Sequence, residues 1–257
     1  MVPITEEERN SPLYKYYARE MVDAPAEKYA SVAEPMDPAK AQSALDMNDL
    51  FKPGYLPGEL GYCNLPDGTA TLANLTPMPG VTPEMFDFWF AWHGVAPMRY
   101  KIWNRDQHYY CLTRNMDKAL DRSLSLKERY WDTTHDVEED CNMGKQKIQI
   151  HFRNPADIGF DPALLKDFKG TIVCSGDEFA PTIMCHFIRP VEGGCELRTR
   201  FWMGYRVVDK KPVKADFPPN FQFPLEPVKA LLLHNIKEFT NLAAILPEVY
   251  AEFHEAF

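Results

Sequence analysis

The feature that most constrains the fold of this chain is a run of β-type sequence that ends in one long helical segment. Residues 100–213 have a sequence pattern typical of β-strands, and residues 147–152 alternate between apolar and polar side chains with period two. A turn at residues 192–194 favours a hairpin. Further strands are predicted over residues 171–174, 182–188 and 197–208.

The chain closes with a predicted helix that begins near Pro224 or Pro227 and runs to Leu246, where Pro247 kinks or restarts it. The apolar stripe of this helix consists of Leu232, Ile236, Phe239 and Ala243. Antiparallel strands followed by one amphipathic helix predict an α+β fold. In such a fold a curved sheet grips the helix, with room for a cavity between them.

The N-terminal region differs in texture from the rest of the chain. Many of the 22 prolines fall in residues 1–80, together with several Pro-Gly and Asp-Gly turn signals. We therefore expect residues 1–80 to form a proline-rich arm with short helices, and residues 81–257 to form the main domain. A buried helix is predicted from Thr82, which serves as its N-cap, to Gly94.

Charge and cysteine usage exclude several classes of protein. Asp and Glu total 37 against 28 Lys and Arg, for a net charge of −9, which argues against nucleic-acid and anionic-membrane partners. No apolar stretch approaches the roughly 20 residues of a membrane span, and the N-terminus lacks the pattern of a signal peptide. Six scattered cysteines without a C-x-x-C pair indicate reduced thiols in the cytoplasm. We expect a cytoplasmic protein that acts on a small molecule, and a homodimer is compatible with these features.

The C-terminal helix carries a pair that suits metal binding. His234 and Glu238 are four residues apart, so an imidazole and a carboxylate lie on one helix face. A surface hydrogen-bonded pair has the same spacing. Apolar neighbours crowd this pair, however, and a buried carboxylate needs a compensating charge.

Further ligands would come from the predicted sheet. The candidates are His108 and the acidic cluster at residues 136–140. Glu138 and Glu139 point to opposite faces of a strand, so only one of them can enter a cavity. His108 is equally compatible with an ordinary core or loop position, and the acidic cluster with a solvated turn.

Several motifs, taken in order, resemble a known family. They are Gly-Tyr-Cys-Asn-Leu-Pro-Asp-Gly at residues 61–68, Met-Pro-Gly-Val-Thr-Pro-Glu-Met at 78–85, Phe-Ala-Trp-His at 90–93, Arg-Tyr-Lys-Ile-Trp at 99–103, His108, Val-Glu-Glu-Asp at 137–140, and His234-x-x-x-Glu238. This set resembles the phloretin hydrolase and 2,4-diacetylphloroglucinol hydrolase family over residues 60–240. The resemblance implies a helix-grip (Bet v 1-like) catalytic domain with an added N-terminal region.

The resemblance also implies one Zn²⁺ ion held by His108, Glu139, His234 and Glu238. Glu139 is preferred to Glu138 because it directly precedes Asp140 of the motif. A divalent metal held by two histidines and two carboxylates fits hydrolytic chemistry.

Three further residues are expected in the substrate pocket. Tyr100 matches a family tyrosine that faces the substrate hydroxyls, and Tyr205 and His186 match on a looser alignment that leaves ordinary sheet packing open. Cys111 departs from the family pattern, which has an asparagine that contacts the substrate at this position.

The implied reaction is hydrolysis of the carbon–carbon bond between an acyl group and a phloroglucinol ring. It is a retro-Claisen step that would convert phloretin to phloroglucinol and phloretate, or diacetylphloroglucinol to monoacetylphloroglucinol and acetate. One alternative is a non-catalytic carrier of aromatic ligands. A third and weaker candidate is a metal-dependent ring-cleaving oxygenase. Metal analysis separates the carrier from the hydrolase.

Overall fold

An antiparallel sheet wrapped against one long helix forms the centre of the computed structural model, which describes residues 1–176 and 180–257. The eight-stranded sheet has the order β1-β2-β8-β7-β6-β5-β4-β3, and a two-stranded sheet pairs β10 with β9. The strands are β1 (Gly61–Asn64), β2 (Ala70–Pro79), β3 (His108–Thr113), β4 (Thr133–Glu139), β5 (Gln146–Arg153), β6 (Thr171–Ser175), β7 (Thr182–Val191), β8 (Gly194–Met203), β9 (Tyr205–Val208) and β10 (Lys211–Lys214).

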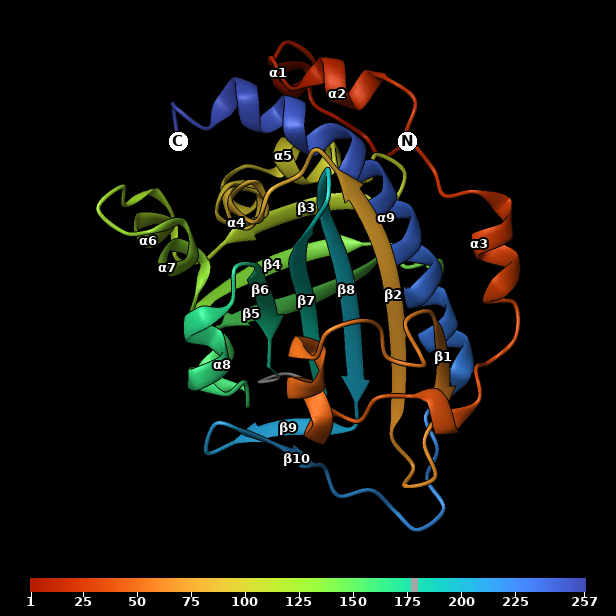
Figure 1. Ribbon diagram of the computed structural model, residues 1–257. Helices are drawn as coiled ribbons and strands as arrows, with labels where there is room; N and C mark the ends of the chain where they lie inside the picture. Colours follow the sequence, from red (N-terminus) through yellow and green to blue (C-terminus); the bar gives the residue numbers. More distant parts are fainter. Residues whose placement is uncertain (177–179) are drawn as a thin grey trace.

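Short helices surround this sheet, and α9 is the long one (Figure 1). The α-helices are α1 (Glu6–Arg9), α2 (Tyr14–Ala18), α3 (Ala26–Ser31), α4 (Pro83–Trp92), α5 (Pro97–Lys101), α6 (Met116–Leu120), α7 (Leu126–Tyr130), α8 (Pro162–Asp167) and α9 (Leu225–Phe253). Short 3-10 helices are η1 (Pro38–Lys40), η2 (Ala44–Phe51), η3 (His93–Val95) and η4 (Pro155–Asp157).

Helix α9 is fixed to the sheet and to the segment before β3 by buried hydrogen bonds. Asn74 Nδ2 on β2 donates to Asn235 Oδ1 over 2.9 Å, and Trp103 Nε1 donates to the Glu238 carbonyl over 3.0 Å. Asn241 Nδ2 donates to the Trp103 carbonyl over 2.8 Å. These contacts confirm the expected α+β arrangement in which a sheet grips the C-terminal helix.

The helix is longer than expected, because it continues through Pro247 to Phe253. Proline costs one intrahelical hydrogen bond. Leu246 and Val249 are fully buried on either side of it, so packing of the apolar face offsets that loss.

The boundary expected at residue 80 is wrong, because β1 and β2 belong to the main sheet. Strand β2 pairs with β8 from Ala70 opposite Met203 to Pro79 opposite Gly194. Strand β1 covers only residues 70–73 of β2, so the later half of β2 is a sheet edge. Proline is tolerated at an edge, which explains why a proline-rich sequence forms a strand here. The arm therefore ends near residue 60.

The arm follows the outside of the domain. In Figure 1, α1 and α2 lie over the C-terminal end of α9, and α3 runs beside that helix. Tyr16 on α2 donates its hydroxyl to Glu252 over 2.8 Å. Further along, Glu59 accepts from two arginines of β8 that are almost fully buried, Arg198 and Arg200, with 2.6 Å between Glu59 Oε2 and Arg200 Nη2.

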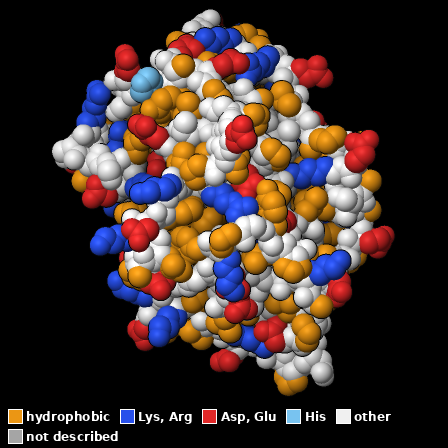
Figure 2. All heavy atoms as spheres, in the orientation of Figure 1, with side chains coloured by type: hydrophobic (Ala, Val, Ile, Leu, Met, Phe, Trp, Pro, Cys, Tyr) orange, Lys and Arg blue, Asp and Glu red, His pale blue; other side chains and the backbone are white. Residues whose placement is uncertain are grey.

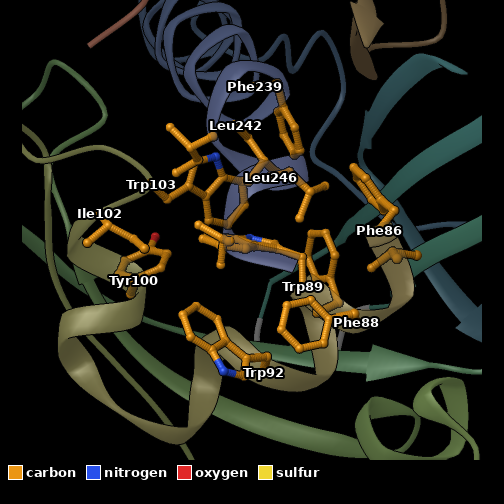
Figure 3. Packing of buried hydrophobic residues seen from close by; sticks show 14 of the residues in the cluster. Phe86, Phe88, Trp89, Trp92, Tyr100, Ile102, Trp103, Phe239, Leu242 and Leu246 are labelled. Atoms are coloured by element: carbon orange, nitrogen blue, oxygen red, sulfur yellow. The ribbon is translucent and has the colours of Figure 1, made fainter. Parts of the chain in front are cut away.

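The main core is aromatic and centres on α4, where Thr82 caps the helix as predicted by accepting from the Met85 amide over 3.2 Å. Figure 3 shows rings of α4 and α9 converging with Trp103. Trp89 and Trp103 meet edge to face at 5.8 Å between ring centroids, and Trp103 and Phe239 at 5.1 Å. This packing fixes the segment between α4 and β3 against α9.

The surface agrees with the charge pattern of the sequence. On the face in Figure 2, basic and acidic side chains are interspersed, and no continuous basic patch is visible. Within the described residues, no helix is both long enough and apolar enough to cross a bilayer.

We expect Glu59→Gln to lower the free energy of unfolding by about 3–5 kcal/mol, because it leaves two buried guanidinium groups without their carboxylate. Burial alone raises the pKa of Glu59, but the hydrogen bonds and charges of Arg198 and Arg200 bring it down to about 2. Since this pKa is depressed in the native state, the stabilisation is complete above the reference value of 4.5 and is lost as the pH falls toward about 2.

Urea denaturation from pH 7 to pH 3 measures both effects. The control is Asp49→Asn, which removes a half-exposed partner of Lys52 and should change stability by no more than about 0.5 kcal/mol. A loss below about 1 kcal/mol for Glu59→Gln would show that the other hydrogen bonds of the arginines, from Arg198 to the Leu50 carbonyl and from Arg200 to Gln42 and the Thr199 carbonyl, suffice without the carboxylate.

Candidate metal centre and active site

Four titratable side chains from three elements meet at one end of the sheet. His108 begins β3 and Glu139 ends β4, and the two residues pair directly in the register of these strands. His234 and Glu238 face them from α9. Exposed fractions are 0% for His108, 2% for His234, 7% for Glu238 and 8% for Glu139. The sequence prediction for this set is thus consistent with where these side chains lie.

The donor atoms of these residues point at one another. His108 Nε2 lies 3.3 Å from His234 Nε2 and 3.4 Å from Glu238 Oε2. His234 Nε2 lies 3.7 Å from Glu238 Oε2, and each histidine Nε2 lies 3.9 Å from Glu139 Oε2. The four atoms therefore enclose a single small space.

The other ring nitrogen of each histidine, Nδ1, already forms a hydrogen bond within the protein. His108 Nδ1 lies 3.2 Å from the Tyr100 carbonyl, and His234 Nδ1 lies 3.0 Å from Gln107 Oε1. Both partners are acceptors, so each Nδ1 carries the proton and each Nε2 presents a lone pair. Two lone pairs 3.3 Å apart repel unless a positive charge lies between them. The same outer contacts are the ones that orient histidines toward metals in proteins.

The carboxylates are held in the same way. Glu238 Oε1 accepts from Asn235 Nδ2 over 3.1 Å, and Glu139 Oε1 accepts from Cys141 Sγ over 3.3 Å. Glu139 Oε2 also accepts a hydrogen bond from the Tyr100 hydroxyl. Each glutamate is thereby fixed in orientation.

Charge in this cluster is out of balance without a cation. Burial, together with the neighbouring Glu139, holds the pKa of Glu238 well above its usual range. Burial, together with His234, holds the pKa of His108 well below its usual range. Two ionised carboxylates and two neutral imidazoles would balance a divalent ion.

The donor set fits a four-coordinate divalent ion. A tetrahedron with metal–ligand distances of about 2.0–2.1 Å has edges of about 3.3–3.4 Å. Five of the six separations between the four donor atoms, all except that between the two carboxylate oxygens, are 3.3–3.9 Å and close to these edges. Nitrogen and carboxylate oxygen are donors that such an ion accepts.

This centre opens onto a cavity of about 940 Å³ between the sheet and α9. His234, Glu238 and Glu139 line one part of its wall, and Tyr100 and His186 line it as expected. Other parts of the wall are apolar and aromatic, from Phe90, Phe152, Met184, Phe201, Met203 and Leu231. The volume is in the range of cavities that bind small organic molecules.

Tyr100 and His186 occupy defined positions in this wall. The Tyr100 ring stacks on His108 with 3.8 Å between centroids, which brings its hydroxyl to the metal-ligand cluster. His186 on β7 has Nδ1 3.0 Å from Thr199 Oγ1. Burial lowers the pKa of His186 to about 3, so this imidazole is neutral at physiological pH.

The prediction that Tyr205 faces the pocket is wrong. Gly204, with φ of +99°, ends β8, and the chain then enters the small sheet. The side-chain alternation of β8 is lost at this glycine. The Tyr205 hydroxyl lies 3.1 Å from Ser43 Oγ in a second core cluster, away from the cavity lining. Phe201 and Met203, on β8 itself, line the cavity instead.

Sequence reasoning did not assign several cavity residues, among them His93, His135 and Cys141. His93 follows α4, His135 lies on β4, and Cys141 lies two residues beyond Glu139. All three line the cavity. The two histidines are buried, and Cys141 is partly exposed. A signal for His135 was present. Alternation along β4 buries Thr133, His135, Val137 and Glu139 on one face, so counting back from Glu139 identifies it.

Comparison with known proteins finds relatives that match nearly the whole chain. A family model described as the DAPG hydrolase PhiG domain matches residues 42–251. The phloretin hydrolase of Eubacterium ramulus is 35% identical over 266 residues, covering 100% of this chain and 95% of that protein. A 2,4-diacetylphloroglucinol hydrolase of a Pseudomonas species is 28% identical over 273 residues, covering 95% and 89%. Among solved structures, Ara h 8.0201 covers 70% of this chain with a TM-score of 0.42 at 9% identity.

Fold and site together define a helix-grip protein with two histidines and two glutamates gathered beside a large cavity. Within that class, the chain belongs to the DAPG hydrolase PhiG domain family, whose model spans most of its length. The relatives also match nearly the whole chain, so the N-terminal arm is part of what they share.

We expect Glu139→Ala to lose bound metal and Glu138→Ala to keep it. Glu139 points into the cluster, whereas Glu138 points outward to Lys145 and Lys147 at 2.7 and 3.0 Å. Loss of an exposed ion pair should change stability by no more than about 0.5–1 kcal/mol. Metal per chain, measured by mass spectrometry after dialysis against zinc, tests the pair. Equal metal content in both variants would contradict the assignment of Glu139.

Proposed function

We propose that this protein is a zinc-dependent hydrolase that cleaves the carbon–carbon bond between an acyl group and a phloroglucinol ring. The observation that carries the proposal is the close approach of two unprotonated histidine Nε2 atoms, 3.3 Å apart, beside two buried glutamates. The names of the relatives, phloretin hydrolase and 2,4-diacetylphloroglucinol hydrolase, supply the substrate class.

His108, Glu139, His234 and Glu238 would hold the zinc ion. When bound, zinc supplies Lewis acidity toward a water molecule or a carbonyl oxygen. Residues of the chain itself would bind and orient the substrate and donate hydrogen bonds to it.

The reaction consumes one water molecule. The water oxygen becomes part of the released carboxylic acid, and the bond between the acyl carbon and the ring carbon breaks. Its electron pair passes to the ring, where neighbouring oxygens share the charge, and the ring carbon takes up a proton. A site for this reaction needs hydrogen-bond partners for ring oxygens close to the acyl carbonyl.

Tyr100 suits the role of a hydrogen-bond donor at that point. Its hydroxyl lines the cavity and donates to Glu139 Oε2. Burial, together with the charge of Glu139, keeps the pKa of Tyr100 well above its usual value, so the hydroxyl retains its proton. The hydroxyl has a single proton, so we expect it to turn from Glu139 to a substrate oxygen as negative charge develops there, once a metal ion holds the Glu139 carboxylate.

His186 suits the role of a neutral partner for a ring hydroxyl. Its Nδ1 is held by Thr199, so Nε2 is the atom left to face the cavity that His186 lines. Because burial lowers the pKa of His186 to about 3, we assign it hydrogen bonding to the ring in preference to storage of a proton.

The second candidate function is a carrier that binds aromatic molecules without cleaving them. Much of the cavity wall is apolar, so the cavity would accept many aromatic ligands, and this favours a carrier. A carrier has no need of two histidines and two glutamates that converge. Conversion and metal dependence therefore separate the two functions.

We expect the zinc-loaded protein to release phloroglucinol and phloretate from phloretin, or acetate from diacetylphloroglucinol. Prolonged chelation should abolish release, and added zinc should restore it. Liquid chromatography of both products measures the reaction. Tight binding of either substrate with no product, in protein that holds one zinc per chain, would favour the carrier.

We expect Tyr100→Phe to retain zinc and to lower kcat by about 10²-fold, since it removes one donor to developing charge. The matched control is Tyr62→Phe, which alters a buried tyrosine outside the cavity lining and should leave kcat unchanged. Steady-state kinetics with metal analysis measures the pair. Wild-type kcat and KM in Tyr100→Phe would mean that this residue only packs against His108.

A further inference from the structure

A second cluster of titratable groups lies beside the metal-ligand cluster and takes no part in it. Ring nitrogens of His93 and His135 and the sulfur of Cys111 lie within 4.8 Å of one another. The three residues are 2%, 3% and 0% exposed. Both histidines line the cavity, whereas Cys111 lies behind them and is not part of the lining.

The first histidine presents an acceptor to the cavity. His93 Nδ1 lies 2.9 Å from the Trp89 carbonyl, which can only accept, so Nδ1 carries the proton. Its Nε2 is then a lone-pair acceptor. Among the described residues, no hydrogen bond to this Nε2 is formed, and His93 lines the cavity.

The second histidine presents a donor. Cys111 Sγ lies 3.6 Å from His135 Nδ1. Burial, together with Glu139, holds the pKa of the Cys111 thiol well above its usual value, so the sulfur keeps its proton and donates it to Nδ1. His135 then carries its own proton on Nε2, the nitrogen left for the cavity.

The backbone is shaped to admit this imidazole. A Cβ atom at Gly94 would lie 2.3 Å from His135 Cε1, 2.7 Å from Nδ1 and 2.9 Å from Nε2. The ring therefore lies against the bare backbone of η3, and any other residue at position 94 would push it away. Cys111 on one side and Gly94 on the other fix the position of His135.

Both imidazoles are uncharged under physiological conditions. Burial lowers the pKa of His93 to about 4. Burial, together with His93, holds the pKa of His135 well below its usual range. A neutral donor and a neutral acceptor therefore lie side by side, with 5.4 Å between ring centroids.

We propose that His93 and His135 form a subsite for one phenolic hydroxyl of the substrate ring, and that Cys111 is a positioning residue that sets the tautomer of His135. A phenolic hydroxyl both donates and accepts, which matches His93 Nε2 and His135 Nε2–H. An oxygen with two hydrogen bonds of about 2.8 Å has partners about 4.6 Å apart, and a ring nitrogen of His93 lies within 4.8 Å of a ring nitrogen of His135.

The subsite rests on the proposed function for its choice of ligand, and its location agrees with that function. The His93 ring lies 6.0 Å from the Tyr100 ring, which in turn stacks on His108. A ring hydroxyl at the subsite thus leaves the acyl group of the same molecule near the metal-ligand cluster. A metal ion is the competing occupant, but the cluster contains no carboxylate and its thiol is already hydrogen-bonded.

The test compares binding of phloroglucinol with binding of resorcinol, which lacks one of the three ring hydroxyls. Neither compound carries an acyl group, so calorimetric titration measures binding without turnover. We expect the wild-type, zinc-loaded protein to bind phloroglucinol about tenfold more tightly. In His135→Phe the ratio should fall to within about twofold of one, with zinc content unchanged. His254→Phe, outside the cavity lining, is the matched control and should keep the wild-type ratio.

Two further variants test the role of Cys111 even if His135→Phe does not fold. Cys111→Ser retains a donor to His135 Nδ1 and should keep the wild-type ratio, whereas Cys111→Ala should lower it. Cys63→Ala, at another buried cysteine outside the cavity lining, should leave it unchanged.

An unchanged ratio in both His135→Phe and Cys111→Ala would overturn the subsite, as would a wild-type ratio near one. A second metal equivalent that disappears in Cys111→Ala would also overturn it, because the cluster would then be a metal site. If the wild-type ratio is high and falls in the variants but no acylphloroglucinol is cleaved, the subsite stands and the proposed hydrolysis fails.

Discussion

Two unprotonated imidazole nitrogens, His108 Nε2 and His234 Nε2, approach to 3.3 Å at the centre of the site. One belongs to the sheet and the other to α9, so the contact lies where the two halves of the fold meet. A cation between them would join sheet and helix as well as complete the charge balance. Metal binding and the packing of α9 would then be coupled, as is usual when ligands come from separate elements.

The elements around this contact hold the ligands in place. The register of β3 and β4 sets His108 opposite Glu139, and the hydrogen bond from Trp103 to the Glu238 carbonyl sets the position of α9 along the sheet. Gln107 joins the two parts, since its Oε1 accepts from Asn104 Nδ2 over 2.8 Å and lies 3.0 Å from His234 Nδ1. A small shift of α9 would therefore misplace two ligands together.

The sequence predicted those parts of the molecule that follow a regular period. Helical spacing placed His234 and Glu238 on one face, and strand alternation separated Glu139 from Glu138; the outward ion pairs of Glu138 agree with that separation. Prediction failed where the period is interrupted. Gly204 interrupts the alternation of β8, so Tyr205 points away from the cavity. The prolines of β2 argued against a strand, but they are tolerated because the later half of β2 is a sheet edge. In both cases the structure depends on how the strands pair in the sheet, which the local sequence pattern does not reveal.

The cavity combines two kinds of polarity that serve different purposes. The metal-ligand cluster concentrates ionisable groups at one place, whereas His93, His135 and His186 are kept neutral by burial, and each has its Nδ1 bound to the protein. Neutral imidazoles can recognise ring hydroxyls without adding charge near the reacting carbonyl. Positive charge in this wall would compete with a cation for the two glutamates. Burial of these histidines therefore protects the charge balance of the centre while leaving hydrogen-bond partners for a polyhydroxylated ring.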